Sequence, residues 1–365
     1  MGSKSDLQNA ITQLQAIKDI VLGLPDKYEL IEYPNGTEWT QSNITSHDFY
    51  CVYYGNGIWV TGSYSNGLYY SIDGKSWTQS NITDGHFGYV YYANGIWVSC
   101  NGHFTNYYSG VYYSTDGKTW TQSNITSDCF ECVYYANGIW VAGSSGNGLY
   151  YSTDGKTWTQ SEITSGNFNS VYYGNGAWIA AETYTQMGLF YSTDGMTWTS
   201  QVTNLLGSGN FLKVYYANGI WVTGSYSSKG LYYSIDGITW TQSNITSGGF
   251  SGGKVGNYTY YANGIWVAAN SGNGLYYSTD GKTWTQSNIT SGSFGCVYNA
   301  NGIWVAGEFG NINGLYYSTD GKSWTQSNIT SGDFMSVYYG NNIWVTGSSS
   351  NGLYYSVTWE PIKEK

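Results

Sequence analysis

The sequence predicts an all-β protein, an eight-bladed β-propeller of four-stranded antiparallel blades preceded by a short N-terminal α-helix. A repeat recurs eight times at spacings of 38 to 45 residues, which fits the ~40–45-residue unit of a propeller blade. Each copy contains four short strands, and a spare strand near the N-terminus matches one that is missing at the C-terminus. The first tryptophan of the unit stands at Trp59, Trp97, Trp140, Trp178, Trp221, Trp266, Trp304 and Trp344.

Four strands, named A to D in chain order, account for each copy of the repeat. Strands A and B (VYYA and IWVAG) flank an Asn-Gly pair, the strongest short hairpin signal, because a type I′ turn needs two positive φ angles. Strands C and D (GLYYS and TWTQS) flank Thr-Asp-Gly-Lys, a second tight turn. Period-2 alternation and the content of Tyr, Trp, Val, Ile and Thr favour strands throughout.

The two ends of the chain predict how the ring closes. Residues 30–45 align with a C–D hairpin, with Trp39 in the place of Trp77. The C-terminus has a strand C at 352–356 but lacks the Asp-Gly turn and the strand D that should follow. We therefore expect the N-terminal strand to complete the eighth blade, which removes the open sheet edges. The predicted domains are an N-terminal amphipathic helix and linker (1–27) and the propeller (28–365).

Residues 4–22 predict an amphipathic helix, with Ser5 as its N-cap and Gly23 and Pro25 as its stop. Fewer than three heptads is short for an independent coiled coil. Packing on the ring is the favoured expectation, and a homo-oligomer formed through this helix is the alternative. The apolar positions of the helix are Leu7, Ile11, Leu14, Ile17 and Val21.

The composition excludes several classes of partner. All 13 basic residues are lysine and the net charge is -10, which argues against a nucleic-acid binder. No apolar run approaches the ~20 residues that span a bilayer, so no membrane insertion is expected. The localisation stays open. An extracellular or virion surface is favoured, and free thiols would fit prior assembly in the reducing cytoplasm.

Cysteine and histidine usage predicts neither a metal site nor a cofactor. Cys51, Cys132 and Cys296 take equivalent positions in blades that are not adjacent, and the total of five cysteines is odd, so mostly free thiols are expected. Cys129 and Cys132 form a lone C-x-x-C without partner ligands. The three histidines are scattered and do not form a zinc signature.

The S-T-D-G-K-T-W segment resembles the Asp-box of BNR-type, sialidase-like propellers, whose usual form is S-x-D-x-G-x-x-W. Here glycine directly follows the aspartate, one residue tighter than that pattern. The resemblance implies the fold and a turn-bracing role for the box. Sialidases of that family hold the substrate carboxylate with an arginine triad, and this chain has no arginine, so no enzymatic role is carried over. The box aspartates are Asp73, Asp116, Asp154, Asp194, Asp236, Asp280 and Asp320.

Length variation between repeats predicts the functional face. The A–B and C–D turns keep their length in every complete unit, and every insertion can be placed in a B–C or D–A connection. In an up-and-down sheet these two connections emerge at the same end of the blade. Function concentrates on variable loops held by a rigid scaffold, so this face is predicted to bind a ligand. The alternative is neutral drift in exposed loops.

Candidate binding residues come from the inserted loops and from the residues around the start of strand A. Aromatic faces with adaptable hydrogen-bonding neighbours suit sugars and protein surfaces. The pair before the strand-A valine is expected to rim the central channel. The loop candidates are His103, Phe104, Tyr107, Tyr184, Tyr258 and Phe309. The candidates near strand A are Asp48, Asp84, His86, Tyr89, Asp128, Glu131, Lys213 and Asp333.

The sequence therefore favours a non-enzymatic binding propeller that recognises glycans or another cell-surface ligand, in a phage-tail or bacterial-surface context. Two alternatives remain open. The acidic residues before the phenylalanine of four D–A loops (Asp48, Asp84, Asp128 and Asp333) form a crescent that could serve a glycoside hydrolase or bind a cation. The chain could also be a repeat scaffold that has no ligand.

Overall fold

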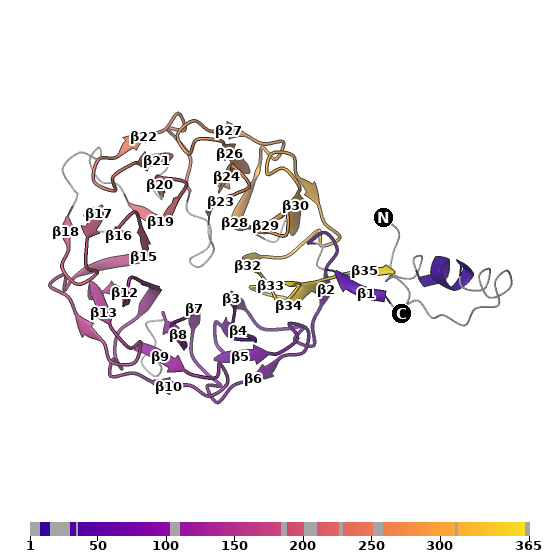
Figure 1. Cartoon of the computed structure of the whole chain (residues 1–365), viewed down its shortest axis with the longest axis horizontal. Coiled ribbons are helices and arrows are strands. Elements are labelled where there is room, and N and C mark those ends of the chain that lie inside the picture. Colours follow the sequence, from indigo (N-terminus) through magenta and orange to yellow (C-terminus); the bar gives the residue numbers. More distant parts are fainter. Residues whose placement is uncertain are drawn as a thin grey trace.

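The protein is an eight-bladed β-propeller, shown by a computed structural model in which the blades surround a central axis (Figure 1). The structure describes residues 8–14, 30–33, 36–102, 110–183, 188–200, 210–225, 229–250, 258–310 and 313–361.

Each blade is an antiparallel sheet in the order A, B, C, D, with strand A next to the axis (Figure 1). The A strands are β3 (Phe49–Gly55), β7 (Phe87–Ala93), β11 (Phe130–Ala136), β15 (Gly166–Gly174), β19 (Phe211–Ala217), β23 (Thr259–Ala262), β28 (Gly292–Ala300) and β32 (Phe334–Gly340). The B strands are β4 (Ile58–Ser63), β8 (Ile96–Asn101), β12 (Ile139–Gly146), β16 (Ala177–Glu182), β20 (Ile220–Ser225), β24 (Ile265–Ala269), β29 (Ile303–Phe309) and β33 (Ile343–Ser348).

Strands C and D form the outer half of each blade. The C strands are β5 (Leu68–Ser71), β9 (Gly110–Ser114), β13 (Leu149–Ser152), β17 (Leu189–Ser192), β21 (Leu231–Ser234), β26 (Leu275–Ser278), β30 (Leu315–Ser318) and β34 (Gly352–Ser356). The D strands are β6 (Thr78–Gln79), β10 (Thr121–Gln122), β14 (Thr159–Gln160), β18 (Thr199–Ser200), β22 (Thr241–Gln242), β27 (Thr285–Gln286), β31 (Thr325–Gln326) and β2 (Thr40–Gln41). The short β25 (Ser271–Gly272) pairs with β28 of the next blade.

The A–B hairpins are closed by the Asn-Gly pairs that predicted them. In the first blade Asn56 has φ 50° and Gly57 has φ 78°, the two left-handed residues of a type I′ turn. The eighth blade departs from the repeat because Asn341 and Asn342 take these places with φ 46° and 58°. Asparagine tolerates the left-handed region better than other residues with a side chain, so the hairpin keeps its length.

The ring is closed by the N-terminal strand β2, which pairs with β34 and completes the eighth blade. The Trp39 amide donates to Asn328 Oδ1 (2.8 Å), and Asn328 Nδ2 donates to the Trp39 carbonyl oxygen (2.9 Å). On its other side the same segment reaches the first blade, where the Trp77 amide donates to Asn43 Oδ1 (2.8 Å). The N-terminal segment is therefore held by both neighbouring blades.

This two-way amide bridge recurs between blades and explains the repeated Asn-x-Thr sequences. In each bridge one asparagine side chain accepts from the amide of the next blade's strand-D tryptophan and donates to its carbonyl. The side chain that a glycan would modify is thus used to join two blades. The bridges pair Asn43 with Trp77, Asn81 with Trp120, Asn124 with Trp158, Asn244 with Trp284, Asn288 with Trp324 and Asn328 with Trp39.

Residues 30–33 do not form the strand C that the alignment of 30–45 predicted. They form β1 (Leu30–Tyr33), which pairs with the last strand, β35 (Thr358–Pro361). Strand C of the eighth blade is β34, so its place beside β2 is already taken. Beyond the eighth blade the two chain ends pair with each other instead, as a two-stranded ribbon that extends from the ring (Figure 1).

The hydrophobic core lies between neighbouring blades. A typical cluster joins Val98 and Val111 of the second blade to Phe130, Val133 and Trp140 of the third. The eight strand-B tryptophans are each at most 1% exposed. Because every cluster needs two blades, each blade depends on its neighbours for burial, as expected for a repeat architecture.

The seven box aspartates brace the C–D turns, as the sequence predicted. In the fourth blade Asp194 Oδ1 accepts from the amides of Met196 and Thr197 (both 2.8 Å) and from Ser192 Oγ (3.0 Å). Partial burial opposes ionisation, but these hydrogen bonds outweigh it and lower the pKa of Asp194 to about 2. The pKa values of the other six box aspartates are lowered in the same way.

The propeller is expected to lose stability steeply below pH 4, because the unfolded chain takes up protons at pKa values of about 3.9 while the folded boxes stay ionised. The stabilisation that the ionised box aspartates give to the folded state is complete above that pH. It is lost as the pH falls toward about 2, the pKa of Asp194. Urea midpoints measured from pH 2 to 5 will check this. Asp194→Asn removes one titrating box and should make the slope shallower; an unchanged slope would contradict the assignment.

The N-terminal helix is described over residues 8–14, within the predicted span 4–22. Ile11 is buried and Leu14 is 62% exposed. Packing and oligomerisation through this helix both remain predictions. In the described part of the chain no helix is long and apolar enough to cross a membrane.

Candidate functional site

The antiparallel order of the strands places all B–C and D–A connections at one end of the blades, here called the variable face. The A–B and C–D turns lie at the other end, the constant face. The sequence insertions fall between β8 and β9, β16 and β17, β18 and β19, β22 and β23, and β29 and β30. All of these are B–C or D–A connections, so the strands that flank every insertion end at the variable face.

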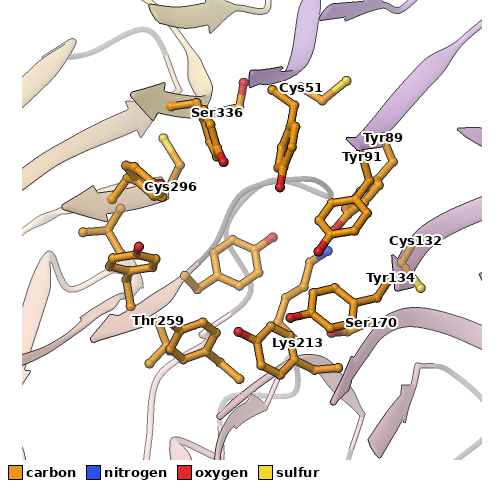
Figure 2. A pocket seen from close by; sticks show the side chains of 18 of the residues that line it. Cys51, Tyr89, Tyr91, Cys132, Tyr134, Ser170, Lys213, Thr259, Cys296 and Ser336 are labelled. Atoms are coloured by element: carbon orange, nitrogen blue, oxygen red, sulfur yellow. The ribbon is translucent and has the colours of Figure 1, made fainter. Parts of the chain in front are cut away.

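A central cavity of about 270 Å³ lies on the axis and is lined by the A strands of all eight blades (Figure 2). A tyrosine at the same strand-A position of every blade lines it, and adjacent rings of this set have centroids 4.6–5.7 Å apart around a complete circle. We call this set the tyrosine belt. Its members are Tyr53, Tyr91, Tyr134, Tyr172, Tyr215, Tyr260, Tyr298 and Tyr338.

The belt presents neutral hydroxyl groups to the cavity. Burial, followed by the neighbouring tyrosines, raises the pKa of Tyr53 and of Tyr172 far above the ordinary value. These phenols therefore stay protonated and can both donate and accept hydrogen bonds. Tyr134 and Tyr172 stack at 4.6 Å, and Tyr134 also meets Trp178 edge-on, so the rings are held by their neighbours.

A second layer of the cavity differs from blade to blade. It comes from the position two residues before the belt tyrosine, and Figure 2 shows it beside the belt. The sequence predicted that the pair before the strand-A valine would rim the channel; its second member lines the cavity. We call this set the variable layer. Its members are Cys51, Tyr89, Cys132, Ser170, Lys213, Tyr258, Cys296 and Ser336.

A β-bulge explains why the first member of each pair does not join this layer. In the first blade the register shifts between Phe49 and Cys51, so an extra residue, Tyr50, opposes the same partner strand. A bulge re-aims side chains. Tyr50 contacts the rings of Tyr64 (5.6 Å) and His86 (5.7 Å), whereas Cys51 lines the cavity.

Lys213 is the charged side chain of the cavity lining. It is half-buried, its Nζ donates to the Asn169 carbonyl oxygen (3.1 Å), and it stands 5.7 Å from the centroid of the Tyr89 ring. Burial lowers the pKa of Lys213, an effect that Cys132 and Glu131 partly oppose. The sequence analysis selected Lys213 and Tyr89, and the structure brings them into contact across the channel.

The thiols of the variable layer are structural. All five cysteines of the chain are buried thiols outside any disulfide, in line with the prediction of mostly free thiols. Cys51 Sγ lies 3.6 Å from the Phe87 carbonyl oxygen and donates to it, and Cys132 does the same to Phe168 (3.5 Å). Burial raises the pKa of Cys51 and of Cys132 to about 12. A thiol in that state is a poor nucleophile and a poor metal ligand.

Three carboxylates of the predicted acidic crescent accept hydrogen bonds from nearby loops and strands. Asp128 accepts from Asn147 Nδ2 and from the Tyr150 hydroxyl (both 2.5 Å). Asp84 Oδ1 accepts from the Gly85 amide (2.7 Å). Asp333 accepts from the Gly310 amide and from Ser349 Oγ. These bonds are the ones expected of acids that hold loops in shape.

The remaining crescent residue, Asp48, shares a neighbourhood with Asp333. Burial raises the pKa of Tyr50, and then Asp48, Tyr64 and Asp333 add to that effect, so the two carboxylates flank this tyrosine at the seam of blades eight and one. His86 is buried against Tyr64, with ring centroids 4.4 Å apart. This cluster lies at the start of the A strands, beside the cavity.

Three other candidates stand apart from the loop tips. Tyr258, assigned by sequence to an inserted loop, is 2% exposed, lines the cavity and packs among Phe294 and Trp304. It takes the strand-A position that cysteine, serine, tyrosine or lysine fills in the other blades, so the insertion ends before it. Phe309 is half-buried at the end of β29, and Glu131 is half-buried in β11. His103, Phe104, Tyr107 and Tyr184 lie outside the described residues.

Across the described ranges no three His, Cys, Asp or Glu side chains gather into a group that could hold a metal ion. Sequence reasoning missed the tyrosine belt, because it searched for differences between repeats and this tyrosine is present in all eight. The signal that could have found it is the first tyrosine of the repeated Val-Tyr-Tyr (Thr-Tyr-Tyr or Val-Tyr-Asn in two copies), two residues after the variable position.

Comparison with known proteins supports the fold and leaves the family open. No protein-family model and no curated protein matches this chain. The computationally designed Ika8 protein is 9% identical with a TM-score of 0.65, over 88% of this chain and 100% of its own. Saccharomyces cerevisiae Sqt1 is 10% identical with a TM-score of 0.61, over 90% of this chain and 100% of its own. YCF48 bound to D1 peptide is 14% identical with a TM-score of 0.52, over 89% of this chain and 99% of its own. At these identities the shared property is the β-propeller fold.

Proposed function

We propose that this protein is a non-enzymatic binding propeller that recognises a glycan, or another cell-surface ligand, at its variable face. The observation that carries the proposal is the one-sided distribution of insertions: the strands that flank every insertion end at the variable face. Neutral drift in exposed loops should lengthen turns on both faces. Variable connections on a rigid scaffold are the usual place of recognition.

The chemistry of this face suits binding more than catalysis. Acid–base hydrolysis of a glycoside needs two carboxyl groups that face a shared substrate. Here Asp84 accepts a hydrogen bond from its own loop, and Asp128 and Asp333 accept hydrogen bonds from nearby B–C connections. The tyrosine belt and the variable layer instead offer aromatic faces and neutral hydroxyl groups, which suit the apolar and polar sides of a sugar ring.

Two further points bear on the context of this function. The tight Asp-Gly turn resembles the Asp-box of BNR-type propellers, which favours a phage-tail or bacterial-surface adhesion module. YCF48 is described with a bound peptide, so a propeller of similar fold can also take a polypeptide. Binding of a peptide in place of a glycan would therefore change the proposed ligand class to a polypeptide.

A glycan array with three forms of the protein tests the proposal. The double variant Tyr107→Ala/Tyr184→Ala changes two insertions of the variable face. Tyr258 is left intact because its burial would confuse binding with folding. The control, Lys118→Ala/Lys156→Ala, changes two C–D turns of the constant face. We expect the wild type and the control to bind the same glycans and the loop variant to lose at least tenfold in affinity.

Three results would count against the proposal. Equal binding by the loop variant and the wild type would remove the variable face from recognition. Turnover of any glycoside on the array, lost in Asp48→Asn or Asp333→Asn, would establish the hydrolase instead. Absence of binding to glycans and to peptides would favour the scaffold alternative.

A further inference from the structure

The central cavity holds one cation inside a wall that is otherwise neutral and largely aromatic. Lys213 is the charged member of the lining, and the rest consists of tyrosine, cysteine, serine, threonine and valine. Among the described residues its ammonium donates one hydrogen bond, to the Asn169 carbonyl oxygen. An ammonium carries three N–H donors, so donors remain for a ligand.

The surroundings make a half-buried cation costly without an anion. Burial lowers the pKa of Lys213, and Cys132 and Glu131 only partly oppose this effect, so the charged form is disfavoured there. The Tyr89 face at 5.7 Å gives partial compensation through a cation–π contact. A carboxylate placed against the ammonium would compensate it fully and would form the stronger, charge-assisted type of hydrogen bond.

The rest of the cavity limits what can carry that carboxylate. A volume of about 270 Å³ lies just below the range of ~300–1,000 Å³ usual for ligand pockets, so the cavity fits no more than one sugar-sized unit. The belt supplies hydroxyl groups that donate and accept, in a ring of aromatic edges (Figure 2). Ser336 adds a hydroxyl that is buried without a hydrogen-bond partner, although the side chain is 7% exposed. A body with several hydroxyl groups can pair with the Ser336 hydroxyl and exchange hydrogen bonds with the belt, which an alkyl chain cannot do.

We infer that the central cavity binds a carboxylated monosaccharide, a hexuronate, with its carboxylate on Lys213 and its hydroxyl groups on the tyrosine belt. This inference rests on the proposed function and deepens it, because it names the ligand class and the residue that selects it. The alternation of cysteine, serine, tyrosine and lysine in the variable layer then makes the site asymmetric. One orientation of the sugar is selected within a ring that is otherwise nearly symmetric.

Calorimetric titration of the full chain with galacturonate, glucuronate, galactose, glucose and acetate tests the inference. We expect a uronate to bind at least tenfold more tightly than the neutral sugar of the same configuration and than acetate. Lys213→Met keeps the length of the side chain and should remove that preference, so that the uronate and the neutral sugar bind with equal affinity. The matched control is Lys118→Met, because Lys118 also stands over a tyrosine ring, Tyr70, but on the constant face.

A second measurement keeps the inference testable if Lys213→Met does not fold. Reductive ¹³C-methylation of the lysines gives one resolved signal for each side chain, and addition of the uronate should shift that of Lys213 and leave that of Lys118 in place. Equal affinity for uronate and neutral sugar, or an unshifted Lys213 signal, would overturn the inference. Tighter binding of triglycine than of uronate would also overturn it, in favour of a peptide carboxylate.

The two proposals fail in different ways. If the glycan array is positive and depends on the variable face but the uronate preference is absent, the cavity assignment fails and the proposed function stands. If no glycan on the array is bound and no uronate binds, both the proposed function and the cavity assignment fail. If uronate binds in the cavity and the loop variant binds the arrayed glycans as the wild type does, the recognition site lies at the axis and not in the loops.

Discussion

Trp39→Ala is expected to destabilise the propeller by about 3–5 kcal/mol, the usual cost of removing a buried aromatic side chain. Trp39 is 3% exposed and packs with Val305, Phe334 and Trp344 between blades seven and eight. Its Nε1 also donates to the Gly36 carbonyl oxygen (3.1 Å). The side chain packs the N-terminal segment that closes the ring against blades seven and eight. Its removal therefore weakens the junction at which the ring closes.

Trp77→Ala is the matched control, because Trp77 has the same role within a continuous blade. It is 4% exposed and its Nε1 donates to the Gly74 carbonyl oxygen (3.2 Å). Both variants lose similar packing. Strand β6 stays tethered to β5 through the C–D turn, whereas β2 has no C–D turn to β34 and is held by hydrogen bonds and packing. Only Trp39→Ala should therefore release a strand and open the ring.

Urea denaturation gives the two losses of stability, and hydrogen exchange of the β34 amides reports the opening. We expect fast exchange in β34 for Trp39→Ala and slow exchange in β5 for Trp77→Ala. Addition of a peptide with residues 36–46 should slow the exchange again in the first variant. Equal exchange in the two variants would show that closure does not depend on this side chain.

Gly143→Ala is expected to cost about 1–3 kcal/mol, the usual penalty for overpacking a core. A Cβ at this position would stand 2.5 Å from the Phe168 carbonyl oxygen and 2.7 Å from Cys132 Sγ. Cys132 is its cross-strand partner. The glycine therefore leaves room both for the next blade and for the thiol of the variable layer.

The chain itself offers the compensating change. In the fourth blade the equivalent cross-strand pair is Ser170 and Ala181. The double variant Cys132→Ser/Gly143→Ala copies that pair and should recover part of the loss. A double-mutant cycle from urea denaturation is expected to give a favourable coupling of at least about 0.5 kcal/mol. Additive effects would mean that the Phe168 carbonyl, and not the thiol, sets the limit.

Local signals account for most of what could be predicted. Asn56-Gly57 fixes the A–B hairpin because few other residues take two positive φ angles, and the Ser71–Asp73 turn is closed by bonds between residues at most three apart. The repeat then fixes the number of blades. The prediction failed for residues 30–33, where the local pattern fits a strand C but the place was already filled by β34.

The sequence by itself determined the blade, the count of blades and the face that varies, because each follows from short-range turn chemistry repeated along the chain. The tertiary structure alone decided what the axis contains. Tyr89 and Lys213 meet only after the ring has closed, and the bulge after Phe49 decides that Cys51 and not Tyr50 lines the cavity. Contacts between distant blades depend on the curvature of the whole ring, which no single repeat encodes.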